Sequence, residues 1–103
     1  MTRHLGQELV SLWQTHRDAP WPRLSSPNEG ELMTLDTVIS GCVTYYLEAE
    51  DGLDEQRRTM LVSCLEDLTD LLPELPEEDR DYFTRLSRLA RLLLEDQGGS
   101  PAP

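Results

Sequence analysis

The sequence lacks lysine entirely, contains only two cysteines and has no long hydrophobic run. All nine basic residues are Arg, a bias that we interpret as the codon usage of a GC-rich bacterial genome. The longest uncharged run extends from Thr37 to Leu47 and is about half the length of the roughly 20 apolar residues that cross a bilayer. The first residues lack the apolar centre of a secretory signal peptide. These absences predict a protein of the cytoplasm without a membrane-spanning segment.

The two cysteines, Cys42 and Cys64, do not form a metal-binding pattern with the two histidines, His4 and His16. Zinc sites use four ligands, usually in closely spaced pairs, and these four residues are spread widely along the chain. Both cysteines fall on apolar faces of predicted helices, which favours buried, reduced thiols; a redox pair is the alternative. We expect neither a metal nor a cofactor.

Acidic residues dominate the middle of the chain. The whole protein has a formal net charge of −11, and residues 28–79 alone contain fifteen acids but only two Arg. A protein that binds nucleic acid or anionic lipid has to neutralise phosphates with basic side chains. The charge therefore argues against nucleic acid and membranes as partners, and it favours a basic protein surface.

Apolar residues recur at helical spacing in four segments: 3–17, 26–50, 55–72 and 76–97. The run Thr37–Tyr46 is rich in β-formers, but no second β-rich run is present to pair with it, so we interpret it as helix. Short connections predict an all-α fold, an antiparallel bundle of three long helices plus an N-terminal helix. We expect residues 1–97 to form one domain and residues 98–103 a disordered tail.

Local signals mark the boundaries of the second and third helices. Ser26, Pro27 and Glu29 match a capping box with proline in the first helical position. Gly52 can adopt the left-handed conformation that ends a helix, and Asp54 can cap the helix that follows.

The second helix carries a small, uncharged strip opposite its apolar face, formed by Met33, Thr37, Ser40, Gly41 and Thr44. A strip without charge predicts a central helix that is covered on nearly all sides. The small side chains also predict a groove where another backbone can approach closely.

Residue patterns that support catalysis are missing from the sequence. His4 and His16 are more than three helical turns apart and cannot share a site, and His16 is predicted to pack at the edge of an apolar face. No phosphate-binding loop, nucleophile elbow or metalloprotease motif is present. The acidic turn around Asp51 fails as a calcium loop, because an EF-hand alignment on Gly52 places Arg58 at the last ligand position. We therefore expect no enzymatic activity; an enzyme built on this acidic turn is the weakest alternative.

Three acids, Glu66, Asp67 and Asp70, lie near the C-terminal end of the third helix, where negative charge opposes the helix dipole. Two explanations are open. Arg80 and Arg85 of the returning fourth helix can neutralise them, and the acids can dock a basic partner; the two explanations can both hold.

Two further features are candidate contacts. Arg80, Arg88 and Arg91 form a stripe on the fourth helix. This stripe is a solvated face, a contact with the acidic patch of another molecule, or a surface for self-association. Trp21, between two prolines in the first connection, either packs over the bundle or is presented to a partner.

The sequence thus predicts a small acidic protein-protein interaction module, such as an adaptor, a small chaperone, an immunity or antitoxin-like protein, or a regulatory subunit. Its candidate partner-binding residues are Glu66, Asp67, Asp70, Trp21, Arg88 and Arg91. The alternative is a homo-oligomeric structural or small-ligand-binding bundle, for example a homodimer, that associates through the apolar strip of the first helix or through the Trp21 segment.

Overall fold

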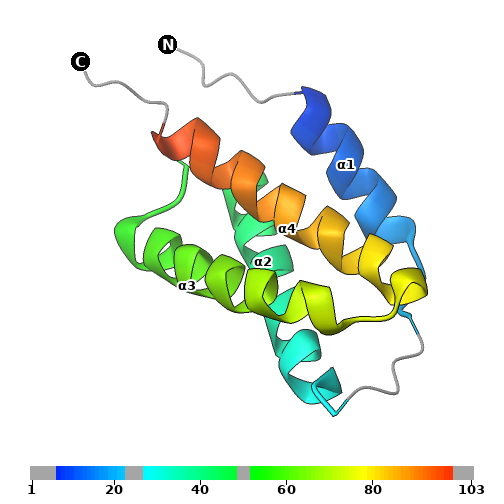
Figure 1. Ribbon diagram of the computed structural model, residues 1–103. Helices are drawn as coiled ribbons and strands as arrows, with labels where there is room; N and C mark the ends of the chain where they lie inside the picture. Colours follow the sequence, from blue (N-terminus) through cyan, green and yellow to red (C-terminus); the bar gives the residue numbers. More distant parts are fainter. Residues whose placement is uncertain (1–6, 23–26, 49–51, 99–103) are drawn as a thin grey trace.

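The computed structural model describes residues 7–22, 27–48 and 52–98, and Figure 1 shows their arrangement. These residues form four α-helices and one short 3-10 helix: α1 (Gln7–Asp18), α2 (Glu29–Glu48), α3 (Glu55–Leu71), η1 (Leu72–Glu74) and α4 (Glu77–Gly98). They contain no β-strand, and the run Thr37–Tyr46 is helical throughout. The predicted all-α helical bundle is confirmed.

Helix α4 packs extensively against each of the three other helices. In Figure 1, α4 crosses the bundle between α1 and α3, and α2 passes behind. The expectation that α2 would be covered on nearly all sides is wrong, because Met33 is 52% exposed and Thr37, Gly41 and Thr44 are also exposed. Helix α1 packs on α4 and leaves this strip of α2 open.

The hydrophobic core lies where α2, α3 and α4 meet. Its largest fully buried side chains are Leu32, Ile39, Val43 and Tyr46 of α2, Leu61 and Leu68 of α3, and Phe83, Leu86, Leu89 and Leu93 of α4. They recur every three, four or seven residues within each helix, as expected for helices that bury one face. Helix α1 adds Leu9, which is 4% exposed.

Helix α2 starts two residues later than predicted. The helix begins at Glu29, and the backbone carbonyl of Asn28 accepts a hydrogen bond from the Leu32 N–H at 2.9 Å. Pro27, expected in the first helical position, lies in the turn that precedes the helix.

The predicted signals between α2 and α3 are confirmed. Gly52 has a φ of 82°, a left-handed conformation that glycine adopts without steric penalty. Asp54 caps α3, because its Oδ1 accepts a hydrogen bond from the Arg57 N–H at 2.8 Å. The other carboxylate oxygen, Oδ2, pairs with the Arg57 guanidinium at 2.7 Å.

Proline interrupts the chain between α3 and α4. Helix α3 ends at Leu71 and passes into η1, which contains Pro73. The carbonyl of Pro76 then accepts hydrogen bonds from two backbone N–H groups in the first turn of α4. Helix α4 continues to Gly98, so Gly98, the expected first residue of the tail, is helical.

Some predicted features lie outside the described residues. They are residues 3–6 of the first helix, the Ser26 cap, residues 49–50 of the second helix, the acidic residue Asp51 and residues 99–103 of the tail.

Candidate functional site

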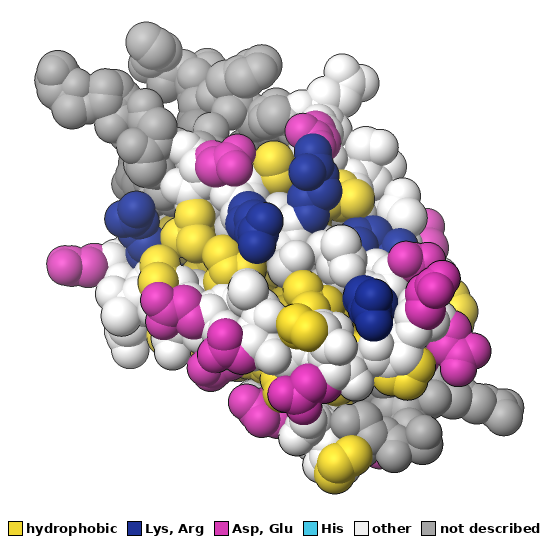
Figure 2. All heavy atoms as spheres, in the orientation of Figure 1, with side chains coloured by type: hydrophobic (Ala, Val, Ile, Leu, Met, Phe, Trp, Pro, Cys, Tyr) yellow, Lys and Arg dark blue, Asp and Glu magenta, His cyan; other side chains and the backbone are white. Residues whose placement is uncertain are grey.

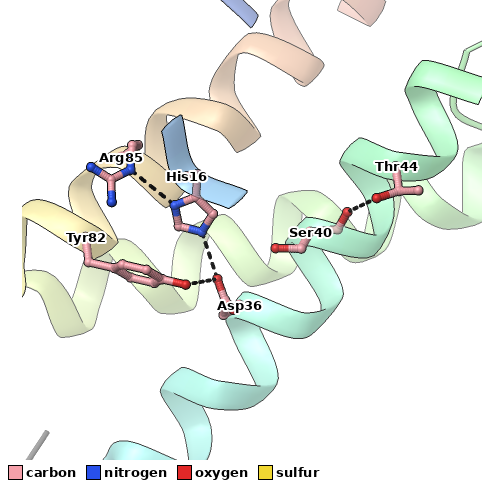
Figure 3. A network of polar contacts seen from close by, with 6 residues as sticks. All are labelled: His16, Asp36, Ser40, Thr44, Tyr82 and Arg85. Atoms are coloured by element: carbon pink, nitrogen blue, oxygen red, sulfur yellow. Dashed lines mark hydrogen bonds and ion pairs between the residues drawn. The ribbon is translucent and has the colours of Figure 1, made fainter. Parts of the chain in front are cut away.

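Four polar side chains from three helices meet between α1, α2 and α4 (Figure 3). His16 lies in the last turn of α1, Asp36 in α2, and Tyr82 and Arg85 one turn apart in α4. His16 Nε2 is 3.0 Å from Asp36 Oδ1, and the Tyr82 hydroxyl donates to the same oxygen at 3.2 Å. Arg85 Nε donates to His16 Nδ1 at 3.3 Å. The contacts form a closed path from α4 through α1 to α2 and back to α4.

The hydrogen-bond partners of His16 define its tautomer. Because Arg85 Nε can only donate, His16 Nδ1 has to accept, and the ring proton is therefore on Nε2. Nε2 then donates to the Asp36 carboxylate. A neutral imidazole thus lies between a guanidinium and a carboxylate, so the charges of the cluster balance.

The His16 ring is enclosed as well as hydrogen-bonded. Its side chain is 2% exposed, with the Tyr82 ring centroid at 4.4 Å and the Trp13 ring centroid at 6.3 Å. A general base needs a free lone pair within reach of a substrate, and both nitrogens of this ring are engaged. This geometry favours a packing role for His16, as the sequence predicts, over that of a general base.

Burial, together with the adjacent Asp36 carboxylate, raises the pKa of Tyr82 to about 12; the Arg85 guanidinium offsets only part of this rise.

An unfolded tyrosine loses its proton near pH 10, so between about pH 10 and 12 the Tyr82 hydroxyl of the folded state holds a proton that the unfolded state has lost. The free energy of unfolding should therefore fall as pH rises through this range. We expect the tyrosinate absorbance of the wild type minus that of a Tyr82→Phe variant to titrate near pH 12. A difference curve centred near pH 10 would contradict this environment of the hydroxyl.

Asp36 is the member of this cluster that the sequence reading missed. A usable signal was present, because Leu32, Ile39 and Val43 precede or follow Asp36 by four, three and seven residues. Those spacings place the carboxylate beside the buried face of α2, where a charged side chain needs a partner.

The three acids of α3 are exposed, and the compensation expected from α4 does not occur. The Arg80 guanidinium donates to the Leu75 carbonyl at 2.9 Å, and Arg85 is engaged by His16. In the described part of the chain, no ion pair involves Glu66, Asp67 or Asp70. The three carboxylates therefore face solvent.

Arg88 and Arg91, two members of the α4 stripe, differ in their contacts. Arg88 forms an ion pair with Glu8 of α1, which joins these two helices at the surface. Arg91 is exposed, and none of the ion pairs between described residues includes it. Arg91 is therefore available to pair with an acidic group of another molecule.

Trp21 combines the two roles considered for it. Its ring meets the rings of Tyr82 and Phe83 edge-on, with centroids at 5.4 and 5.6 Å. It is nevertheless 37% exposed. Trp21 thus packs on α4 and also keeps part of its indole accessible.

Both cysteines are free thiols, with Cys42 buried and Cys64 half-buried. Burial raises the pKa of each thiol, and the Arg57 guanidinium opposes this shift at Cys42. The prediction of buried thiols is therefore confirmed for Cys42 and holds only in part for Cys64.

Metal clusters and membrane-type helices are both missing from the described residues. No group of three or more His, Cys, Asp or Glu side chains there is arranged to hold a metal ion. None of the helices in these ranges has the length and apolar character needed to cross a bilayer.

Comparison with protein-family models, with curated proteins and with solved structures gave no significant match. A proposal for function then depends on the surface of the bundle.

Proposed function

We propose that this protein is a non-enzymatic interaction module of the cytoplasm that binds a basic protein surface through α3. Glu66, Asp67 and Asp70, called here the acidic face of α3, are the centre of the binding surface. The observation that carries the proposal is that all three are exposed and that, within the described residues, none is ion-paired. Unpaired charges of one sign steer and orient a partner of the opposite sign.

The acidic face is unfavourable for the isolated protein. Its charges lie toward the C-terminal end of α3, where the helix dipole is also negative. Asp70 follows Glu66 by four residues and Asp67 by three, so like charges are neighbours on the helix surface. Together these effects cost about 1 kcal/mol of folding stability. Cations supplied by a partner would attract both the carboxylates and the negative end of the helix dipole, and these interactions would offset the cost.

Figure 2 shows how the charges are distributed over one face of the molecule. Acidic side chains line the lower edge of this face, on the side of α3, and Arg side chains stand mainly over α4. Hydrophobic side chains are exposed between them. A partner that approaches the α3 side meets negative charge with apolar surface beside it, the combination typical of a specific interface.

The alternative, self-association through the apolar strip of α1, is less well supported. Leu9 is buried, and Leu12 and Trp13 pack against the core of their own chain. This strip is therefore covered within the molecule. Trp21 is the remaining apolar contact considered for a homodimer.

A variant with Glu66→Gln, Asp67→Asn and Asp70→Asn tests the proposal, because amides keep the shape of each side chain and remove its charge. The immobilised variant and wild type are incubated with extract of the cells that express the chain, and bound proteins are compared by quantitative mass spectrometry. We expect recovery of a partner with a basic surface to fall about tenfold or more, since each charge-assisted contact contributes 1 kcal/mol or more.

The matched control carries Asp18→Asn, Glu31→Gln and Glu95→Gln, which change the net charge by the same amount at exposed positions on α1, α2 and α4. It should recover the partner as well as the wild type does. Equal loss in both variants would show that overall charge, rather than this face, attracts the partner.

A further inference from the structure

A groove of about 570 Å³ lies between α2 and α3. Its apolar lining includes Val38 and Tyr45 of α2 and Met60 of α3, which is 42% exposed. The groove follows α2 from Thr37 to Glu48, a length of about 16 Å, which corresponds to about three turns of helix. Within the described residues, no other helix covers it.

Gly41 lies in the groove at the middle of α2. Glycine inside a helix lowers stability relative to alanine, so its presence calls for a local reason. A Cβ added at Gly41 would meet nothing within 4 Å, so intrachain packing does not require the missing side chain. The bare backbone instead permits a helix from outside the chain to approach α2 closely.

The charges around the groove indicate what kind of helix fits. Arg57 is engaged by Asp54 at 2.7 Å, and its guanidinium carbon lies 3.9 Å above the centre of the Tyr45 ring. Glu48, at the α2 C-terminal end of the groove, takes part in no ion pair with a described cation. Asp67 is exposed and follows Met60 by seven residues, so it shares the Met60 face of α3 and lies about 10 Å further along the helix, away from the end of the groove where Arg57 lies. Unpaired acids thus flank both ends.

We propose that this groove binds an amphipathic helix of a basic partner protein. Apolar side chains of the partner helix lie along Gly41, Tyr45 and Met60, and Lys or Arg side chains at its two ends pair with Glu48 and Asp67. The proposal rests on the proposed function, since Asp67 belongs to the acidic face of α3. A second copy of the chain fits the groove poorly, because it would bring the same acids and the same net charge of −11 to the contact.

The probe is a capped peptide of about sixteen residues, long enough for four helical turns, with Leu on one face and Lys on the other. A second peptide with Glu in place of Lys and a third with the first composition in scrambled order are the controls. Binding is measured by fluorescence anisotropy at several salt concentrations, and contacts are mapped by amide chemical shifts. Of the three peptides, we expect only the Lys peptide to bind. Its binding should change the chemical shifts of the α2 and α3 amides that line the groove.

Three variants locate the binding site. Gly41→Leu fills the groove from an open position and should weaken the Lys peptide by about 30-fold, the effect of blocking a central contact. Thr84→Leu places the same side chain on exposed α4 surface and should have no effect. Glu48→Gln combined with Asp67→Asn should weaken binding about tenfold and reduce its salt dependence.

Three outcomes would overturn the proposal. They are no binding of the Lys peptide up to millimolar concentration, equal binding of the Lys and Glu peptides, and unchanged affinity in Gly41→Leu. Sedimentation that shows a wild-type dimer broken by Gly41→Leu would make a second copy the occupant instead. A Glu66→Gln, Asp70→Asn variant separates the two proposals. If this variant binds the Lys peptide as well as the wild type does and Gly41→Leu does not bind it, the groove is the binding site and Glu66 and Asp70 are not needed for it.

Discussion

Replacing Ile39 with alanine is expected to lower the free energy of unfolding by about 3 kcal/mol and the melting temperature by about 15 °C. Ile39 is fully buried in α2, at the centre of the core shared with α3 and α4. The truncation removes apolar contact and leaves a cavity, and both effects destabilise the folded state. Urea unfolding followed by far-UV circular dichroism measures the change.

Thr37→Ala is the control for Ile39, because it lies two residues earlier on the exposed strip of the same helix. Its free energy of unfolding should stay within about 0.5 kcal/mol of the wild type, as for most surface substitutions. Equal losses at the two positions would mean that α2 does not present these faces to core and solvent as described.

Replacing Asp36 with alanine is expected to cost about 2–3 kcal/mol. The change removes the acceptor for both the His16 Nε2–H and the Tyr82 hydroxyl, and a buried donor left without an acceptor costs about 1–3 kcal/mol. Since His16 belongs to α1, we also expect α1 to open more easily than the rest of the bundle. Hydrogen exchange followed by mass spectrometry should show faster exchange in residues 7–18 of the variant, with α3 changed much less.

Tyr82→Phe is the matched comparison, because it removes one of the two donors rather than the shared acceptor. It should cost about 1 kcal/mol, the usual net value of one hydrogen bond. If Asp36→Ala leaves exchange in α1 unchanged, the cluster does not hold α1 on the bundle.

The helices could be predicted from the sequence because apolar spacing and caps are local signals. The periodic buried positions from Leu32 to Tyr46, the left-handed Gly52 and the Asp54 cap are all where the pattern placed them. The central position of α4 was not predictable in the same way. Each helix pattern shows which face is apolar, but it does not show which neighbour will cover that face.

The contacts of the polar residues were harder to predict for the same reason. Arg85 was considered as a partner for the acids of α3, yet it contacts His16, because α1 packs on α4 and brings the imidazole within reach. Asp36 was overlooked because its partners are twenty and forty-six residues away in sequence. Both errors involve long-range contacts, whereas the exposure of Glu66 and Asp70 follows directly from helical periodicity.

The most direct test of the central claim is the free energy of unfolding of the Glu66→Gln, Asp67→Asn, Asp70→Asn variant. If the acidic face of α3 is a binding surface that is uncompensated within the chain, the variant should be more stable than the wild type, by about 1 kcal/mol at low ionic strength. Glu77→Gln with Glu78→Gln, the same chemical change at the N-terminal end of α4, should lower stability, because acids there complement the helix dipole. A triple variant that is less stable than the wild type would contradict the account, because it would mean that these three carboxylates stabilise the fold.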